Sequence, residues 1–160
     1  MQKSSKRIGE ILIEKKLITE AQLLDALQEQ KASDGFLGGI LIKKGIINSA
    51  ELVVALAEQF NMPLLELKEE YIDMELARRF SSSLILDHKC FPIHQDEDSI
   101  TVAIINPLNA IAISKIEDEA KPRRVKLVLV SEKDIEEAIK NYRQYVSDSI
   151  RRLLNKDKKP

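Results

Sequence analysis

Two stretches of the chain carry the same small set of residues that could hold a ligand. Arg7, Gly9 and Gln30 stand in the first stretch, and Gly38 and Gln59 repeat the glycine and the glutamine 29 residues further on. Arginine offers a planar fork that fits a phosphate or the O6 and N7 atoms of guanine. Glycine allows a ligand to approach the backbone closely, and glutamine adds a donor and an acceptor. The set therefore indicates a candidate binding site that occurs twice.

The whole segment Arg7–Gln30 is repeated as Phe36–Gln59. Roughly half of the aligned positions are identical, and the spacer 31–35 joins the two copies. A repeat of this length indicates two copies of one supersecondary unit. In each copy a short apolar helix is followed by a turn, an N-capping signal such as Thr19 with Gln22, and a second helix with apolar residues at three- and four-residue spacing. The pattern predicts two helix-turn-helix units that bury their apolar faces on each other.

Two details of the repeat lead to specific expectations. The leucines of the second helices should be buried, namely Leu23, Leu27, Leu52 and Leu56. Gly45 fits a helix C-terminus that needs a positive φ. The first copy has Lys16 at that place, so we expect an altered turn there.

The remainder of the chain changes period. Two β-rich runs, 90–94 and 99–105, flank a polar turn and predict a hairpin. An amphipathic helix over 110–120, a third strand over 125–130 and a final helix from Ser131 follow, with an apolar stripe that ends at Ile150 and Leu153 or Leu154. This order predicts an α+β fold, in which a helical lobe of two repeats over 1–62 precedes an α/β lobe with a three-stranded sheet over 68–150. Residues 151–160 form a basic tail or the start of a linker.

Composition limits the possible functions. The 160 residues are 44% hydrophobic with a net charge of -1, so the chain lacks the basic surplus of a nucleic-acid-binding domain. No apolar run approaches the length of a membrane span, and neither a signal peptide nor a disulfide is expected. The single Cys90 is expected to be a buried hydrophobic side chain. These features predict a cytoplasmic domain without direct membrane insertion.

Catalytic motifs are absent from the sequence. It contains no Gly-x-x-x-x-Gly-Lys-Ser/Thr motif for nucleotide phosphates. His88 and His94 lack accompanying ligands at metal-binding spacing. We therefore predict a non-enzyme that needs no metal and no cofactor.

The repeat, with its five-residue spacer, resembles the MshEN domain, the N-terminal module of type II secretion and type IV pilus assembly ATPases. The similarity extends, less specifically, to about residue 142. The resemblance implies a cyclic di-GMP site at Arg7, Gly9, Gln30, Gly38, Gln59 and Asn106, with an apolar flank along Ile8, Leu12, Leu37 and Leu41. It also implies that the tail leads to a motor domain.

Three departures from the family pattern are expected to weaken cyclic di-GMP binding. Phe36 replaces an arginine, Lys16 replaces a glycine, and Asn106 replaces an aspartate before a proline. The favoured function is therefore docking: a regulatory domain that attaches an assembly ATPase to the cytoplasmic domain of an inner-membrane platform protein, with Phe36 in the interface. The alternative is a cyclic di-GMP-binding regulatory domain with a degenerate motif. A DNA-binding helix-turn-helix is disfavoured because the second helices carry acidic residues.

Overall fold

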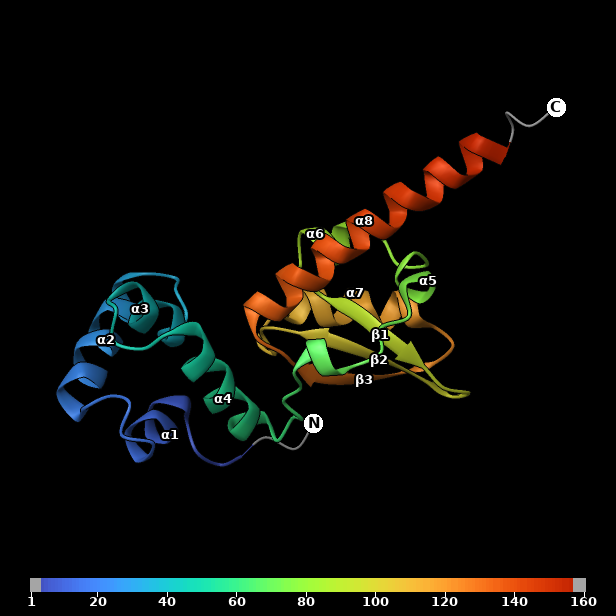
Figure 1. Ribbon diagram of the computed structural model, residues 1–160. Helices are drawn as coiled ribbons and strands as arrows, with labels where there is room; N and C mark the ends of the chain where they lie inside the picture. Colours follow the sequence, from blue (N-terminus) through green and yellow to red (C-terminus); the bar gives the residue numbers. More distant parts are fainter. Residues whose placement is uncertain (1–3, 157–160) are drawn as a thin grey trace. The chain divides into compact units, whose positions relative to one another are not determined.

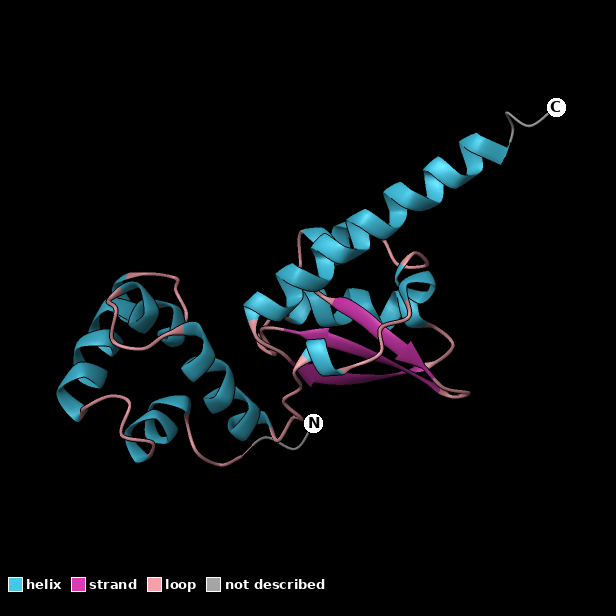
Figure 2. Cartoon of the chain, viewed as in Figure 1, coloured by secondary structure: helices cyan, strands magenta, loops and turns pink. Residues whose placement is uncertain are grey.

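A computed structural model describes residues 4–156 and divides into two compact units, Met1–Leu64 and Leu65–Pro160. The first unit is entirely helical and the second combines a sheet with helices (Figures 1 and 2). The predicted α+β class is confirmed.

The first unit consists of two helix pairs with the predicted repeat. Its helices are α1 (Ile8–Glu14), α2 (Glu20–Ala32), α3 (Leu37–Lys43) and α4 (Ser49–Phe60). Helix α1 packs on α4 and α2 packs on α3, so each repeat covers the other. Equivalent residues of the two copies meet in one core, including the fully buried Ala26 and Ala55. The two repeats therefore share one core.

The turns inside the two repeats have the same geometry. Lys16 adopts φ 58° and Gly45 adopts φ 70°. In both turns the next N–H reaches back across the helix end, from Leu17 to the Leu12 carbonyl and from Ile46 to the Leu41 carbonyl, each at 3.0 Å. The expectation that Lys16 alters the turn is therefore wrong, because the backbone satisfies the same hydrogen bond in both copies.

The predicted capping signals are confirmed at both second helices. Thr19 Oγ1 accepts from the Gln22 N–H at 3.2 Å, while the Gln22 side chain accepts from the Thr19 N–H at 2.9 Å. Asn48 and Glu51 form the equivalent pair at 2.9 and 2.8 Å. These reciprocal bonds satisfy N–H groups that a helix start otherwise leaves unpaired.

The predicted burial of the four leucines is only partly correct. Leu56 is buried, whereas Leu23, Leu27 and Leu52 are half-buried and pack against the core from its edge. The largest fully buried side chains of this unit, such as Leu12 and Leu41, belong to the short first helices. Since α1 and α3 each lie against a helix of the other repeat, their apolar sides are enclosed.

The second unit is built on a mixed sheet in the order β1-β2-β3. Strands β1 (Phe91–Gln95) and β2 (Ser99–Ile104) form the predicted hairpin, and β3 (Arg124–Leu129) runs parallel to β2. Every residue of β2 is buried, so the central strand lies in the core. The helices are η1 (Leu67–Glu69), α5 (Met74–Ala77), α6 (Ser82–Leu86), α7 (Ala110–Ala120) and α8 (Glu132–Lys156).

The final helix departs from the prediction in its second half. Ile135, Ala138 and Ile139 are buried, but Ile150, Leu153 and Leu154 are 52%, 60% and 60% exposed. Helix α8 continues past the sheet (Figure 1), so its last turns have no strand beneath them. The predicted buried stripe is therefore wrong beyond Val146.

Candidate functional site

Arg7 and Phe36 occupy equivalent positions at the starts of the two short helices. Both have extended backbones, with φ -77° in each case, and both side chains are exposed. The Arg7 N–H donates to the Glu10 carboxylate at 2.7 Å, which orders the helix start without engaging the arginine fork. The phenyl ring of Phe36 is 56% exposed. These two positions are available for recognition, one as a cation and the other as an aromatic surface.

Gly9 and Gly38 are buried and serve helix packing. A Cβ atom on Gly9 would lie 2.7 Å from Leu23 Cδ1, and one on Gly38 would lie 2.6 Å from Leu52 Cδ1. Such distances are too short for two carbon atoms, so a side chain at either position would push the leucine end aside, and glycine permits this close contact between the two helices of each repeat. The packing explains both glycines without a ligand.

The two glutamines also make contacts within the first unit. Gln30 Nε2 donates to the Gly35 carbonyl at 3.2 Å and thereby spans the spacer between the repeats. Gln59 is buried, with 6% exposed, and its backbone carbonyl accepts from the Ser4 N–H at 2.7 Å. The glutamines occupy equivalent sequence positions in different surroundings, one at the surface and one inside.

The predicted apolar flank of the ligand is largely inaccessible. Leu12 and Leu41 have no exposed surface and Leu37 has 8%. Ile8 is half-buried against the same core. Leu12, Leu37 and Leu41 therefore offer little surface to a ligand, because the packing of the two repeats covers them, while Ile8 keeps part of its surface.

Asn106 belongs to the second unit, where it shapes the turn after β2. Its side-chain oxygen accepts from the Leu108 N–H at 2.9 Å. The turn borders a pocket of about 200 Å³ that is also lined by His88, Cys90 and Asn109. Burial raises the pKa of the Cys90 thiol to about 12, so this cysteine is protonated and unreactive at neutral pH. The expected burial of Cys90 is confirmed.

Charged side chains within residues 4–156 pair with one another inside each unit. Lys44 contacts Asp25 and Glu29 of α2, each at 2.9 Å, and hydrogen bonds to these carboxylates raise the pKa of the ammonium group. In the hairpin turn, hydrogen bonds from Lys126 and Ser99 hold the pKa of Asp96 below its usual range. Within this part of the chain no three His, Cys, Asp or Glu residues gather as a metal site.

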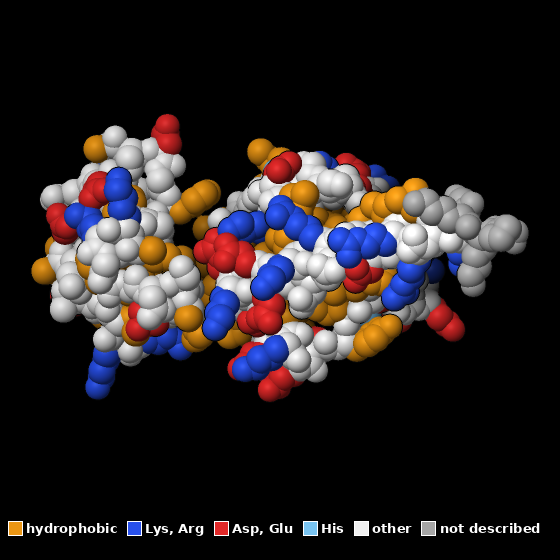
Figure 3. Space-filling view, turned by 45° about the horizontal axis from the view of Figure 1, so that its top comes forward, with side chains coloured by type: hydrophobic (Ala, Val, Ile, Leu, Met, Phe, Trp, Pro, Cys, Tyr) orange, Lys and Arg blue, Asp and Glu red, His pale blue; other side chains and the backbone are white. Residues whose placement is uncertain are grey.

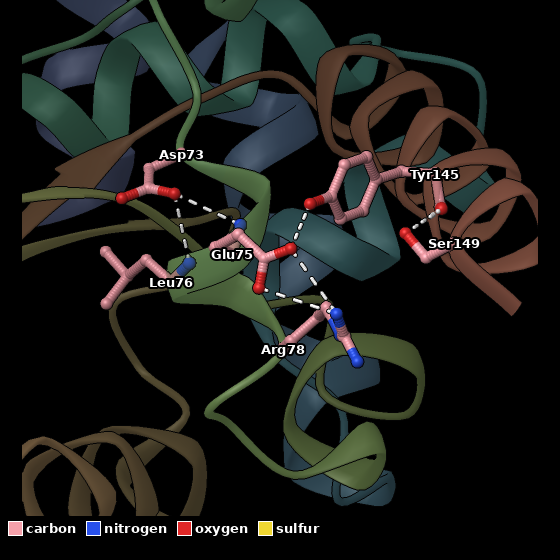
Figure 4. A network of polar contacts seen from close by, with 6 residues as sticks. All are labelled: Asp73, Glu75, Leu76, Arg78, Tyr145 and Ser149. Atoms are coloured by element: carbon pink, nitrogen blue, oxygen red, sulfur yellow. Dashed lines mark hydrogen bonds and ion pairs between the residues drawn. The ribbon is translucent and has the colours of Figure 1, made fainter. Parts of the chain in front are cut away.

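A polar network that the sequence analysis missed joins α5 to α8 (Figure 4). The Tyr145 hydroxyl donates to the Glu75 carboxylate, which also contacts Arg78 at 3.3 Å. Close by, Tyr142 packs edge-on against Phe91 with ring centroids 5.8 Å apart. The two tyrosines are spaced to face one side of a helix, but their partners lie some fifty to seventy residues away, so no local pattern identifies them.

Comparison with known proteins decides the family. A family model of the MshEN domain matches residues 60–156, more than half of the chain. The chain belongs to the MshEN domain family. The matched residues follow the repeat, in the part of the chain where the resemblance to the MshEN domain is less specific. The match also continues beyond residue 142, to residue 156.

Relatives and solved structures extend the similarity to both units of this MshEN chain. The type IV pilus assembly ATPase PilB of Myxococcus xanthus is 28% identical over 138 residues, which are 86% of this chain and 24% of that protein. PilB of Thermus thermophilus is 26% identical over 115 residues, 71% of this chain and 13% of that protein. Because the second unit has 96 residues (65–160), both alignments must include residues of the first unit.

Two solved structures share the fold. MshE, solved with cyclic di-GMP, has a TM-score of 0.76 at 25% identity, covering 86% of this chain and 99% of that chain. The N-terminal domain of XpsE has a TM-score of 0.63 at 17% identity, covering 88% of this chain and 96% of that chain. No helix within residues 4–156 is long and apolar enough to cross a membrane.

By the sequence alignments above, the chain spans about a quarter or less of the length of the PilB proteins that it matches.

Proposed function

We propose that this chain is the non-catalytic N-terminal docking domain of a type II secretion or type IV pilus assembly ATPase. It binds the cytoplasmic domain of an inner-membrane platform protein and thereby holds the motor in the cytoplasm, peripheral to that membrane. The similarity to part of the PilB ATPases and to the XpsE N-terminal domain supports this assignment.

The observation that carries the docking proposal is the exposure of Phe36. An aromatic residue that is 56% exposed at a helix start lies outside the buried core and suits an interface anchor. By contrast, Gly9, Gly38 and Gln30 make packing or hydrogen-bonding contacts within the first unit. These three residues of the ligand-binding pattern thus have a role in folding, while the exposed Phe36, which departs from the pattern, is free to contact a protein.

The docking test measures binding of purified cytoplasmic domains of inner-membrane secretion and pilus proteins to the immobilised chain. Phe36→Ala should weaken the interaction at least about tenfold, as expected for an aromatic anchor worth more than about 1.4 kcal/mol. Tyr71→Ala is the matched control, because Tyr71 is 81% exposed and belongs to the other unit. Failure of every platform domain to bind the unmodified chain contradicts docking. Binding that survives Phe36→Ala places the interface elsewhere.

Cyclic di-GMP binding is the second candidate, supported by the similarity to MshE, which was solved with that ligand. Loss of one charge-assisted hydrogen bond costs about 1.5–3 kcal/mol, so Phe36 and Asn106 together should weaken binding by at least about a hundredfold. We expect calorimetry to give a dissociation constant weaker than about 10 µM. Submicromolar binding that Arg7→Ala abolishes would instead establish the second-messenger function.

A further inference from the structure

The second half of α8, with the recess beside its first half, has the features of a binding surface. A groove of about 530 Å³ lies between α6 and α8 and is lined by Leu86, Lys89, Glu136, Ile139, Lys140, Arg143 and Gln144. The one carboxylate among them, Glu136, pairs with Lys89 at 3.1 Å, so the unpaired charges of the groove are cationic. Along the helix beyond this groove, the side chains of Ile150, Leu153 and Leu154 are more than half exposed. A group of apolar side chains on a helix without a covering element marks an interaction site.

The groove and the exposed end lie on one side of the helix. At about 100° per residue, Ile139, Arg143, Ile150 and Leu154 fall within about 60° of one another. This strip runs from residue 139 to residue 154, a length of about 22 Å. It is therefore a single surface with room for about four turns of a partner helix.

One edge of the strip is cationic. Lys140 and Arg151 lie about 100° and 120° from Ile139 around the helix. Neither they nor Arg143 forms an ion pair or a hydrogen bond through its side chain with any residue of 4–156. On the face seen in Figure 3, Lys and Arg side chains of the second unit are interspersed with hydrophobic and acidic ones. These three cations are available to an acidic partner.

The other edge is occupied by the body of the unit. Tyr142 contacts Phe91 of β1, and Tyr145 donates a hydrogen bond to Glu75 of α5. A partner can therefore approach only from the cationic side and from above the strip. An apolar strip with one cationic edge is complementary to an amphipathic helix with one acidic edge.

We propose that this strip, which we call the α8 strip (Ile139, Arg143, Ile150 and Leu154, with Lys140 and Arg151 at its edge), binds an acidic amphipathic helix of a partner protein. A second copy of the chain fits less well. Antiparallel pairing opposes the two cationic edges, and parallel pairing brings the cationic edge against the side occupied by α5. A flat anionic bilayer cannot enter the recess between α6 and α8. This surface is distinct from Phe36 and does not rest on platform docking.

Two designed peptides of about 18 residues test the proposal. Both are amphipathic helices with leucine on the apolar side; one carries glutamate along the flank and the other carries lysine. Fluorescence anisotropy should show at least about tenfold tighter binding of the glutamate peptide, and amide shifts in an NMR titration should map to α6 and α8. Equal affinity for the two peptides, no binding, or shifts that map elsewhere would overturn the proposal.

Variants at exposed positions distinguish specific peptide binding by the α8 strip from nonspecific hydrophobic binding. Two variants should each lower the affinity for the glutamate peptide at least about tenfold: the double variant Ile150→Ser/Leu154→Ser and the single variant Arg151→Glu. Both should leave the circular dichroism spectrum of the protein unchanged. Ile111→Ser, at a 74% exposed position of α7, is the matched apolar control and should leave affinity unchanged. Phe36→Ala should also leave it unchanged.

Two further outcomes reject the proposed partner. In the first, the chain sediments with vesicles of about 30% phosphatidylglycerol in phosphatidylcholine, the Ile150→Ser/Leu154→Ser variant does not, and the glutamate peptide does not bind. This result assigns the strip to a membrane surface. Self-association in analytical ultracentrifugation that the same variant abolishes assigns it to a second copy.

Discussion

Lys16 ends the first helix of repeat one at φ 58°, and Gly45 ends the corresponding helix of repeat two at φ 70°. Gly9 and Gly38 meet Leu23 and Leu52 with the same lack of space for a methyl group, at 2.7 and 2.6 Å. The repeats thus have the same internal geometry, even where one residue is less suited to it. Positions that determine how the helices meet are equivalent in structure as well as in sequence.

The repeats differ where the side chain faces solvent or where the surroundings are not duplicated. Arg7 and Phe36 share a backbone conformation and exposure but differ in charge and shape. Leu27 is half-buried, whereas its counterpart Leu56 is buried. One repeated pattern thus yields two chemically distinct surfaces on a common core, so ligand-binding capacity cannot be inferred from the repeat alone.

The largest expected contrast is between the two equivalent leucines. Leu56→Ala should cost about 2–5 kcal/mol, as is usual for a fully buried leucine. Leu27→Ala should cost roughly half as much, because its side chain already contacts water. Urea unfolding with hydrogen exchange on α2 and α4 measures both. Equal losses of unfolding free energy would show that the exposure of the two leucines in the folded state does not determine the cost of replacing them.

Glycine substitutions test the shared helix contact. Gly38→Val should cost about 1–3 kcal/mol through overpacking against Leu52, and Gly9→Val should cost about the same against Leu23. Gly39→Val is the matched control, since a Cβ at Gly39 meets nothing within 4 Å. Adding Leu52→Ala to Gly38→Val should recover part of the loss in a double-mutant cycle. A Gly39 variant as unstable as the Gly38 variant would contradict the packing explanation.

Restoring the arginine that repeat two lacks sharpens the surface comparison. Phe36→Arg should strengthen cyclic di-GMP binding at least about tenfold in calorimetry, because a charge-assisted hydrogen bond is worth about 1.5–3 kcal/mol. Combining it with Arg7→Ala should remove the gain if both forks hold one ligand. An unchanged affinity in Phe36→Arg would mean that the aromatic replacement is not what weakens the site.

The smallest expected effect concerns the left-handed turn. Lys16→Gly should raise the free energy of unfolding by about 0.5–1 kcal/mol, since a left-handed conformation costs a residue with a side chain about 1–2 kcal/mol and glycine loses part of this gain through unfolded-state entropy. Gly45→Lys, the reciprocal change, should lower stability by a similar amount in urea unfolding. If Lys16→Gly is neutral, the first turn carries no strain.

Much of the fold was predictable because local patterns encode it. Helix spacing and capping pairs such as Thr19 with Gln22 act over three or four residues, and the confirmed hairpin and β3 follow from their own apolar runs. The candidate site was less predictable. Gly9 and Gly38 were singled out as ligand contacts, but the leucine carbon atoms that lie against them belong to the following helices. Pattern alone could not separate a glycine that admits a ligand from one that admits a side chain.

The repeat, the family resemblance and the order of helices and strands could be recognised without a structure, since they depend on residue types at short spacing. Which apolar residues are covered depends instead on how the elements pack. Leu12 and Leu41 are enclosed by the opposite repeat, whereas Ile150 and Leu154 continue the apolar stripe of α8 past the end of the sheet and remain exposed. An apolar stripe specifies which side of a helix prefers to be buried. The length of the sheet or helix that packs against this side determines how much of it is actually covered.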